Sequence, residues 1–263
     1  MMNVKEMEAR FLKFKADNEI IDINCCLPCW RDSTLEEASI PPETYFSEGI
    51  DKIVLTSTLS ATEAYDEGNE LVFDAAAKDD RILASAVIAP EMNLGGRNFA
   101  SELDAMLKKK TVLVRMYPKE HKYPLRRWLA GEILGELERR SVPLMIWHTQ
   151  AEWNEFAEIA EAFPNLPIIL EGSDQKTLYY VRSVMGLCEK YPNIYLEMHN
   201  FTQYDFLPYA LKFIGAERLL FGSRSPFNDM NVPLGQIFAD ADEAQRKLIL
   251  SENIKRLINN IKN

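Results

Sequence analysis

The stretch Ile20-Ile21-Asp22-Ile23-Asn24-Cys25-Cys26 reads as a short, mostly apolar β-strand with polar side chains at alternate positions. Successive side chains of a strand point to opposite faces, so Asp22, Asn24 and Cys26 are expected to share one face. An apolar run of this length is typical of a strand that is covered on both sides, as in a parallel sheet. The stretch therefore predicts an interior strand that carries polar groups into the protein.

Seven more runs of this kind follow, with helical periodicity between them. The expected strands are Ile20–Cys26, Lys52–Thr58, Ile82–Pro90, Val112–Pro118, Pro143–Thr149, Pro167–Ser173, Ile194–His199 and Arg218–Ser223. The expected helices are Ala61–Lys78, Phe99–Lys110, Leu125–Arg140, Glu152–Phe163, Thr177–Tyr191, Tyr204–Ile214 and a closing helix, Asp242–Ile261. Eight strands that alternate with helices predict an α/β fold, the (β/α)8 TIM barrel. An open doubly wound sheet is the weaker alternative, because no glycine-rich phosphate loop follows the first strand.

Bulk properties predict one domain and disfavour two classes of partner. The chain has 263 residues with 47% hydrophobic content, and no linker interrupts it, so residues 1–263 are expected to form a single barrel domain. A formal net charge of -10 disfavours nucleic acid and anionic membrane surfaces as partners. Neither a signal peptide nor an apolar run of about 20 residues is evident, so a cytoplasmic protein is the expectation.

The site of such a barrel lies at the carboxyl ends of its strands. The last polar residues of the runs are Asn24, Cys26, Thr56, Ser57, Arg115, His148, Glu171, Glu197, His199 and Arg224. His121 falls in a polar loop and is expected to be exposed. Cys26 and Cys29 have the spacing of a redox dithiol, but a buried, inert thiol is the favoured interpretation of Cys26.

These strand ends resemble those of the amidohydrolase superfamily, in its amidohydrolase-related branch of metal-dependent hydrolases and decarboxylases of small carboxylic acids. Asp22-Ile23-Asn24-Cys25-Cys26 stands where that family has Asp-x-His-x-His, and Val142-Pro143-Leu144-Met145-Ile146-Trp147-His148-Thr149 is similar to its fifth strand. Ile169-Leu170-Glu171-Gly172 has Glu171 at a histidine position. Gly222-Ser223-Arg224-Ser225-Pro226 resembles Gly-Ser-Asp-x-Pro, with Arg224 in place of the aspartate. The resemblance extends over nearly the whole chain.

The resemblance implies a divalent metal, but the sequence keeps only His148 of five usual ligand positions. Arginine cannot coordinate a cation, and a divalent ion 4 Å from Arg224 would be repelled by about 8 kcal/mol at an effective dielectric constant of 20. No metal and no cofactor are therefore expected. We hypothesise that a Glu171–Arg224 ion pair replaces the metal.

The resemblance then predicts metal-independent chemistry on a small carboxylated molecule. His148 and Glu171 are the expected acid–base groups, Arg224 stabilises an anion, and Cys26 is a candidate nucleophile. Asn24, Arg115 and His199 are the expected substrate-binding residues. One alternative is a catalytically inactive barrel that is retained as a small-molecule-binding or partner subunit. A second is an atypical metal site built from Cys26, His148, Glu171 and His199. A homo-oligomer is compatible with the resemblance.

Overall fold

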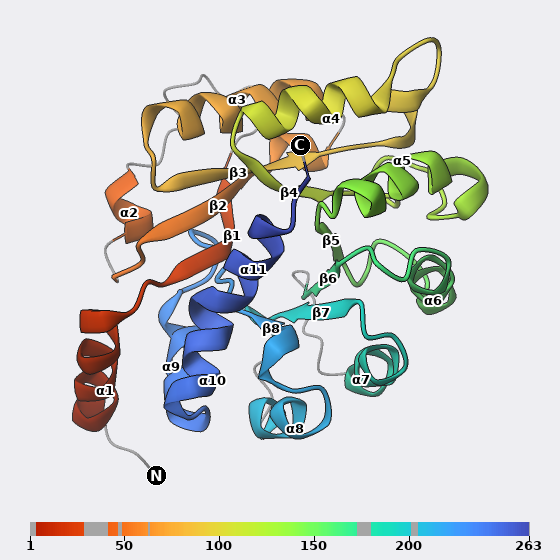
Figure 1. The fold of residues 1–263 in the computed structure, drawn as a ribbon. Coiled ribbons are helices and arrows are strands. Elements are labelled where there is room, and N and C mark those ends of the chain that lie inside the picture. Colours follow the sequence, from red (N-terminus) through yellow and green to blue (C-terminus); the bar gives the residue numbers. More distant parts are fainter. Residues whose placement is uncertain are drawn as a thin grey trace.

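The computed structural model describes residues 4–28, 42–46, 49–62, 64–172, 180–200 and 205–262. Eight strands form one sheet in the order β1 to β8, and every neighbouring pair is parallel (Figure 1). The strands are β1 (Ile21–Leu27), β2 (Lys52–Ser57), β3 (Ile82–Val87), β4 (Thr111–Arg115), β5 (Leu144–Trp147), β6 (Ile168–Glu171), β7 (Ile194–Glu197) and β8 (Leu219–Leu220).

Helices surround this sheet on its outer face, except α11 (Asn253–Asn259), which lies across one end of the barrel (Figure 1). Those longer than five residues are α1 (Val4–Asp17), α3 (Tyr65–Lys78), α4 (Phe99–Lys108), α5 (Arg127–Arg140), α6 (Trp153–Ala162), α7 (Val181–Lys190), α8 (Phe206–Phe213), α9 (Asn231–Asp240) and α11 (Asn253–Asn259). Shorter pieces are α2 (Pro42–Phe46), α10 (Glu243–Lys247) and the 3-10 turns Leu59–Ala61, Pro90–Asn93 and Ala216–Arg218. In the described parts of the chain, no helix combines the length and apolar character needed to cross a membrane.

The first and last strands are joined by backbone hydrogen bonds that close the barrel. The amide of Ile23 donates to the carbonyl of Phe221 at 3.1 Å, and the amide of Cys26 donates to the carbonyl of Ser225 at 2.8 Å. A third bond runs the other way, from the amide of Arg224 to the carbonyl of Asn24 at 2.6 Å. The predicted (β/α)8 TIM barrel is confirmed.

The interior of the barrel is layered. Its lower layer is apolar and includes Leu113, Met145 and Ile169, with Ile254 and Leu257 of α11 packed against it. Inward-facing positions recur every second residue of a strand, so the next layer is made by residues two positions further on. In β4 and β6 these are Arg115 and Glu171, both buried. The strand period thus places charged side chains directly above an apolar floor.

The closing segment differs from the single helix predicted at Asp242–Ile261. It consists of α10, a π-helical turn at Leu248–Glu252, and α11. Asp242 begins it, because its Oδ1 accepts a hydrogen bond from the amide of Gln245 at 2.9 Å. Helix α9 was not predicted, since Pro233 and Gly235 obscure its periodicity.

Candidate functional site

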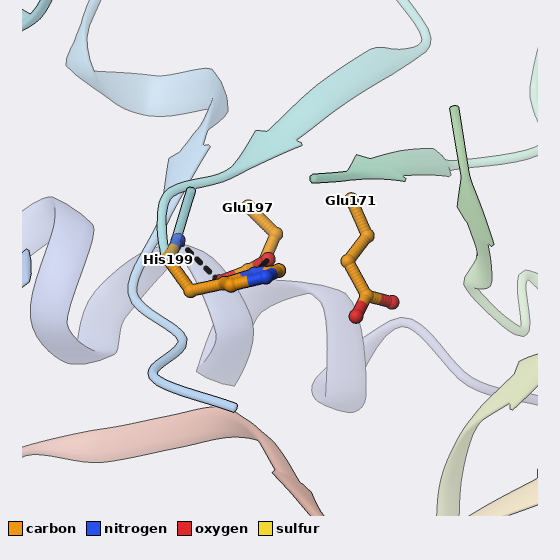
Figure 2. A group of neighbouring side chains, drawn as sticks. All are labelled: Glu171, Glu197 and His199. Carbon is orange, nitrogen blue, oxygen red and sulfur yellow. Dashed lines mark hydrogen bonds and ion pairs between the residues drawn. The ribbon is translucent and has the colours of Figure 1, made fainter. Parts of the chain in front are cut away.

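Five buried polar residues meet at the carboxyl ends of four strands. We call this group the polar centre: Asn24, Arg115, Glu171, Glu197 and His199. Figure 2 shows the carboxylates of Glu171 and Glu197 and the imidazole of His199 turned toward the same space. Ionisable side chains are rarely buried unless they are paired, so the internal contacts of this group decide its chemistry.

Asn24 lies at the middle of the polar centre. Its Nδ2 is 2.9 Å from Glu171 Oε1, 3.2 Å from Glu197 Oε2 and 3.2 Å from His199 Nδ1. Its Oδ1 accepts a hydrogen bond from Arg115 Nη2 at 2.9 Å. A guanidinium can only donate, so the amide oxygen must face Arg115 and the amide N–H groups must face the two carboxylates.

Arg115 is the charge partner of Glu171. Its Nη1 donates to Glu171 Oε2, and its Nε donates to the hydroxyl of Ser85 at 3.2 Å. The predicted Glu171–Arg224 pair is therefore wrong. Arg115 reaches Glu171 past β5, because the side chains at the ends of β4 and β6 both point into the barrel at this level.

Asp22 takes a different role from the one that strand alternation suggested. The register of β1 against β2 shifts between Asp22 and Cys25. Asp22 Oδ1 accepts hydrogen bonds from the amides of Asn24 at 2.9 Å and Ser223 at 3.0 Å. The carboxylate thus supports the β1–β8 junction, whereas the side chain of Asn24 enters the polar centre. Burial raises the pKa of Asp22.

Glu197 and His199 form a close pair at the end of β7. The backbone amide of His199 donates to Glu197 Oε1 at 2.7 Å, and His199 Nδ1 is 2.5 Å from Glu197 Oε2. An ionised carboxylate only accepts, so Nδ1 carries a proton in this contact and the lone pair of a neutral ring resides on Nε2. That Nε2 is buried and has no hydrogen-bond partner among the residues that the structure describes.

His148 is in the same tautomer, with the proton on Nδ1, and it lies among aromatic rings. Its Nδ1 lies 3.3 Å from the carbonyl oxygen of Glu171, and a carbonyl can only accept. Its ring stacks on Trp153 at 6.2 Å and contacts Tyr180 at 5.3 Å between centroids. Burial lowers the pKa of His148, so its imidazole is neutral at neutral pH.

Arg224 follows β8 and is held in a left-handed backbone conformation with φ of 60°. This conformation is uncommon for residues other than glycine, and it recurs at functional sites. The guanidinium carbon lies 4.8 Å from the ring centre of Trp147 and 5.8 Å from that of Phe227. Arg224 therefore brings a positive charge against two aromatic faces.

Gly222 leaves the space that the polar centre needs. A Cβ atom at this position would lie 2.2 Å from Glu197 Oε1 and 2.8 Å from Asn24 Cβ. Both distances are shorter than van der Waals contact, so β8 can approach β1 and β7 this closely only with glycine here.

Cys26 is a buried thiol beside this group. Burial raises its pKa to about 12, so the thiolate is about one part in 10⁵ at pH 7. Its role as a nucleophile stays a prediction. Cys29, the other half of the suggested dithiol, lies outside the described residues.

His121 is not in a solvated loop as expected. Its ring packs among Tyr65, Tyr117 and Tyr123, with centroid distances of 5.8, 6.0 and 6.4 Å. Tyr117 in turn contacts Trp147 at 5.1 Å. Burial lowers the pKa of His121. The expectation of exposure failed because the loop after β4 folds back on its own aromatic residues, Tyr117 and Tyr123, and packs against the distant Tyr65.

A metal ion can be tested against the donor atoms of the polar centre. Glu171, Glu197 and His199 offer ligand atoms within 4.8 Å of one another, and they are the one such group among the described residues. The predicted alternative of Cys26, His148, Glu171 and His199 shares two members with it. Carboxylate and imidazole ligands bind zinc at about 2.0 to 2.2 Å. Here all three surround Asn24 Nδ2, a donor that cannot ligate a metal.

The charge of Arg115 opposes a metal at the same place. A divalent ion about 5 Å from a guanidinium is repelled by about 7 kcal/mol at an effective dielectric constant of 20, a repulsion that the attraction of the two carboxylates opposes. Because Arg115 is bonded to both Asn24 and Glu171, a divalent metal at this place would have to displace the Asn24 amide and compete with the guanidinium for Glu171. The amide and the guanidinium supply the donors that the carboxylates require.

The pairing of Glu197 with His199 was not predicted, although Glu197 is one of the expected strand-end residues. The i, i+2 spacing of Glu197 and His199 was the available signal, because residues two apart on a strand face the same side.

Comparisons of the sequence and of the fold with known proteins identify the family of this chain. The profile of the amidohydrolase family matches residues 33–259. No curated protein matches the chain. Among solved structures, 2,6-dihydroxybenzoate decarboxylase from Rhizobium is 17% identical with a TM-score of 0.69, and the match covers 92% of this chain and 99% of that one.

Two further structures have the same fold. The 5-carboxyvanillate decarboxylase from Sphingomonas paucimobilis is 13% identical with a TM-score of 0.64, over 93% of this chain and 99% of that one. Dihydroxybenzoic acid decarboxylase from Polaromonas, with bound manganese and 2-nitroresorcinol, is 15% identical with a TM-score of 0.66, over 92% and 97%. The family profile spans most of the sequence, and the barrel agrees with it: the chain belongs to the amidohydrolase family.

Proposed function

We propose that this chain is a metal-independent enzyme that acts on a small carboxylated aromatic molecule, with Glu197 and His199 as its proton-transfer pair. The observation that carries the proposal is the 2.5 Å contact between Glu197 Oε2 and His199 Nδ1, which leaves the buried Nε2 as a base. A carboxylate that holds an imidazole in one tautomer, and stabilises the cation formed when it takes a proton, is a recurrent catalytic arrangement.

Arg224 supports an aromatic carboxylate as the substrate class. A guanidinium binds a carboxylate through two parallel hydrogen bonds, and the rings of Trp147 and Phe227 lie beside the Arg224 guanidinium, where they would flank the aromatic ring of such a substrate. The structurally similar decarboxylases act on dihydroxybenzoate and carboxyvanillate. Their identity to this chain is low, so they support the class of substrate and not a particular compound.

The proposed reaction is decarboxylation of a hydroxylated aromatic acid. His199 Nε2 takes the proton of the ring hydroxyl, which increases the electron density on the carboxyl-bearing ring carbon. The protonated His199 Nε2 then gives its proton to that carbon, the bond to the carboxylate breaks and CO2 leaves, and the phenolate oxygen of the product takes a proton from water. His148, neutral and similarly oriented, is the second proposed proton-transfer group. Beneath the substrate, the proposed role of Asn24, Arg115 and Glu171 is structural: the positive charge of Arg115 offsets the negative charge of Glu171, and Asn24 is hydrogen-bonded to both.

A barrel that binds the same ligands without catalysis is the second candidate. Both oxygens of Glu171 are already engaged, by Asn24 and by Arg115, so this carboxylate has little freedom to exchange a proton. If Glu171 were needed as the acid–base group, this engagement would favour a binding protein.

The test measures turnover and binding with the same compounds. Chelator-treated protein is incubated with a series of mono- and dihydroxybenzoates, and product and CO2 are quantified. We expect turnover that added manganese does not increase. Substituting His199→Gln should lower it by about 10² to 10⁴-fold, as loss of a general base does. Glu102→Gln, an exposed carboxylate paired with Arg97, is the control.

The outcomes separate the candidates. Turnover that depends on manganese, or that survives His199→Gln, would contradict the metal-independent proposal. Binding of a hydroxybenzoate, weakened by Arg224→Gln, without any turnover would favour the binding protein.

A further inference from the structure

A second concentration of charge is formed by residues of α1 and of the segment around α10, two helices on the outside of the barrel (Figure 1). A cavity of about 340 Å³ is lined by Arg10, Lys13, Phe14, Glu243 and Arg246. We call it the α1–α10 pocket. None of its residues belongs to the polar centre, so its purpose requires a separate explanation.

Arg246 is the unusual member of this pocket. It is 8% exposed, and its Nε has no hydrogen-bond partner among the described residues. Its guanidinium lies 5.2 Å from the ring centre of Phe238, and no ion pair is found for it within the described part of the chain. Burial and the neighbouring Arg10 lower the pKa of Arg246. The carboxylates of Glu243 and Asp242 act on this guanidinium through their charge, but neither forms an ion pair with it within the described residues, whereas a buried guanidinium is usually ion-paired.

Two of the other three buried arginines have ion pairs within the described residues. Arg115 is paired with Glu171. Arg140 is paired with Asp104 and, at 3.1 Å, with Glu136. Arg246 has no such pair in the described part of the chain, and the pocket that it lines offers a place for an anion.

The charges around the pocket favour a doubly charged ligand. Three cations face one carboxylate, Glu243, which is largely exposed and lies 3.9 Å from Lys13. The lining therefore carries a local excess of two positive charges, in a chain whose formal net charge is -10. Because the protein as a whole is negatively charged, its overall charge does not explain this cluster of positive side chains.

We propose that the α1–α10 pocket binds a small organic phosphate. A phosphate monoester carries about -1.5 to -2 charges at pH 7 and three acceptor oxygens, which match two guanidinium forks and an ammonium group. The cavity is larger than a phosphate ion, and this leaves room for the organic part beside Phe14. This site is independent of the proposed decarboxylation.

Isothermal titration of the full chain with inorganic phosphate and glycerol 3-phosphate tests the proposal, with glycerol as the uncharged control. Both phosphates should bind and glycerol should not. Arg246→Gln should weaken binding about tenfold or more, the effect of losing a hydrogen bond between charged groups. Arg10→Gln and Lys13→Gln change exposed side chains, so they test the pocket even if Arg246→Gln impairs folding. Arg81→Gln, paired with Asp79 elsewhere, is the matched control.

Three results would overturn the proposal. They are an absence of phosphate binding to the unsubstituted protein, equal binding by all the pocket variants, and tighter binding of the dicarboxylate malonate than of either phosphate.

Discussion

Arg115 fixes the orientation of the Asn24 side chain through a 2.9 Å hydrogen bond from Nη2 to Oδ1. The amide N–H groups are consequently presented to Glu171 and Glu197. A neutral residue thereby bridges two buried carboxylates, and the adjacent guanidinium contributes the positive charge.

Arg115→Met should destabilise the protein by about 3 to 5 kcal/mol, because it leaves Glu171 buried without its charge partner. Urea denaturation measures the change. The double substitution with Glu171→Gln should recover part of the loss, since the uncompensated charge is then absent. If Arg115→Met alone lowered the free energy of unfolding by less than about 1 kcal/mol, the Arg115–Glu171 pair would be unimportant for folding.

Asn24→Asp should convert the polar centre into a metal site. The new carboxylate oxygen would face Glu171 and Glu197, at the positions where Nδ2 is now 2.9 and 3.2 Å away. Like-charge repulsion should lower the melting temperature in chelator, and MnCl2 should restore it. The unsubstituted protein is the control. If manganese raised both melting temperatures equally, or neither, Asn24 would not be what excludes the metal.

Gly222→Ala should destabilise the protein by about 1 to 3 kcal/mol, since the added methyl overpacks the contact with Glu197 and Asn24. It should also reduce any turnover, because His199 depends on Glu197 for its orientation. Gly186→Ala is the matched control: its Cβ meets nothing within 4 Å on an exposed position of α7. That substitution should stabilise the helix by up to about 1 kcal/mol. Equal effects at the two glycines would contradict the close packing of β8.

His121 should make stability fall as the pH drops below about 6.5. Its folded-state pKa is lowered by burial, so the unfolded chain binds the proton more readily. The contribution of His121 to the free energy of unfolding is fully present above the pKa of the unfolded chain. It is lost as the pH falls toward the lower pKa of the folded protein, by at most about 1.4 kcal/mol per pH unit. Denaturation of the unsubstituted protein and of His121→Gln between pH 5 and 8 measures the difference. Parallel pH profiles would mean that His121 titrates as an exposed residue.

The fold could be predicted because strand and helix periods are local properties. Apolar runs such as that ending at Arg115 marked each strand, and the strand-end rule located Asn24, Glu171 and His199 correctly at one end of the barrel. The pairings could not be predicted, because they join strands that are not neighbours in the sheet. Arg224 was predicted as the partner of Glu171 and Arg115 as a substrate-binding residue, whereas the structure pairs Arg115 with Glu171.

The bond from the Arg224 amide to the Asn24 carbonyl has a consequence for the order of assembly. Asn24 precedes Arg224 by about 200 positions, yet the two meet where β1 joins β8. Glu171, Glu197 and Arg115 lie between them in the sequence, so these charged side chains are synthesised before the segment that joins β8 to β1. The enclosed, water-free surroundings of the polar centre therefore form only when the two ends of the barrel sequence come together.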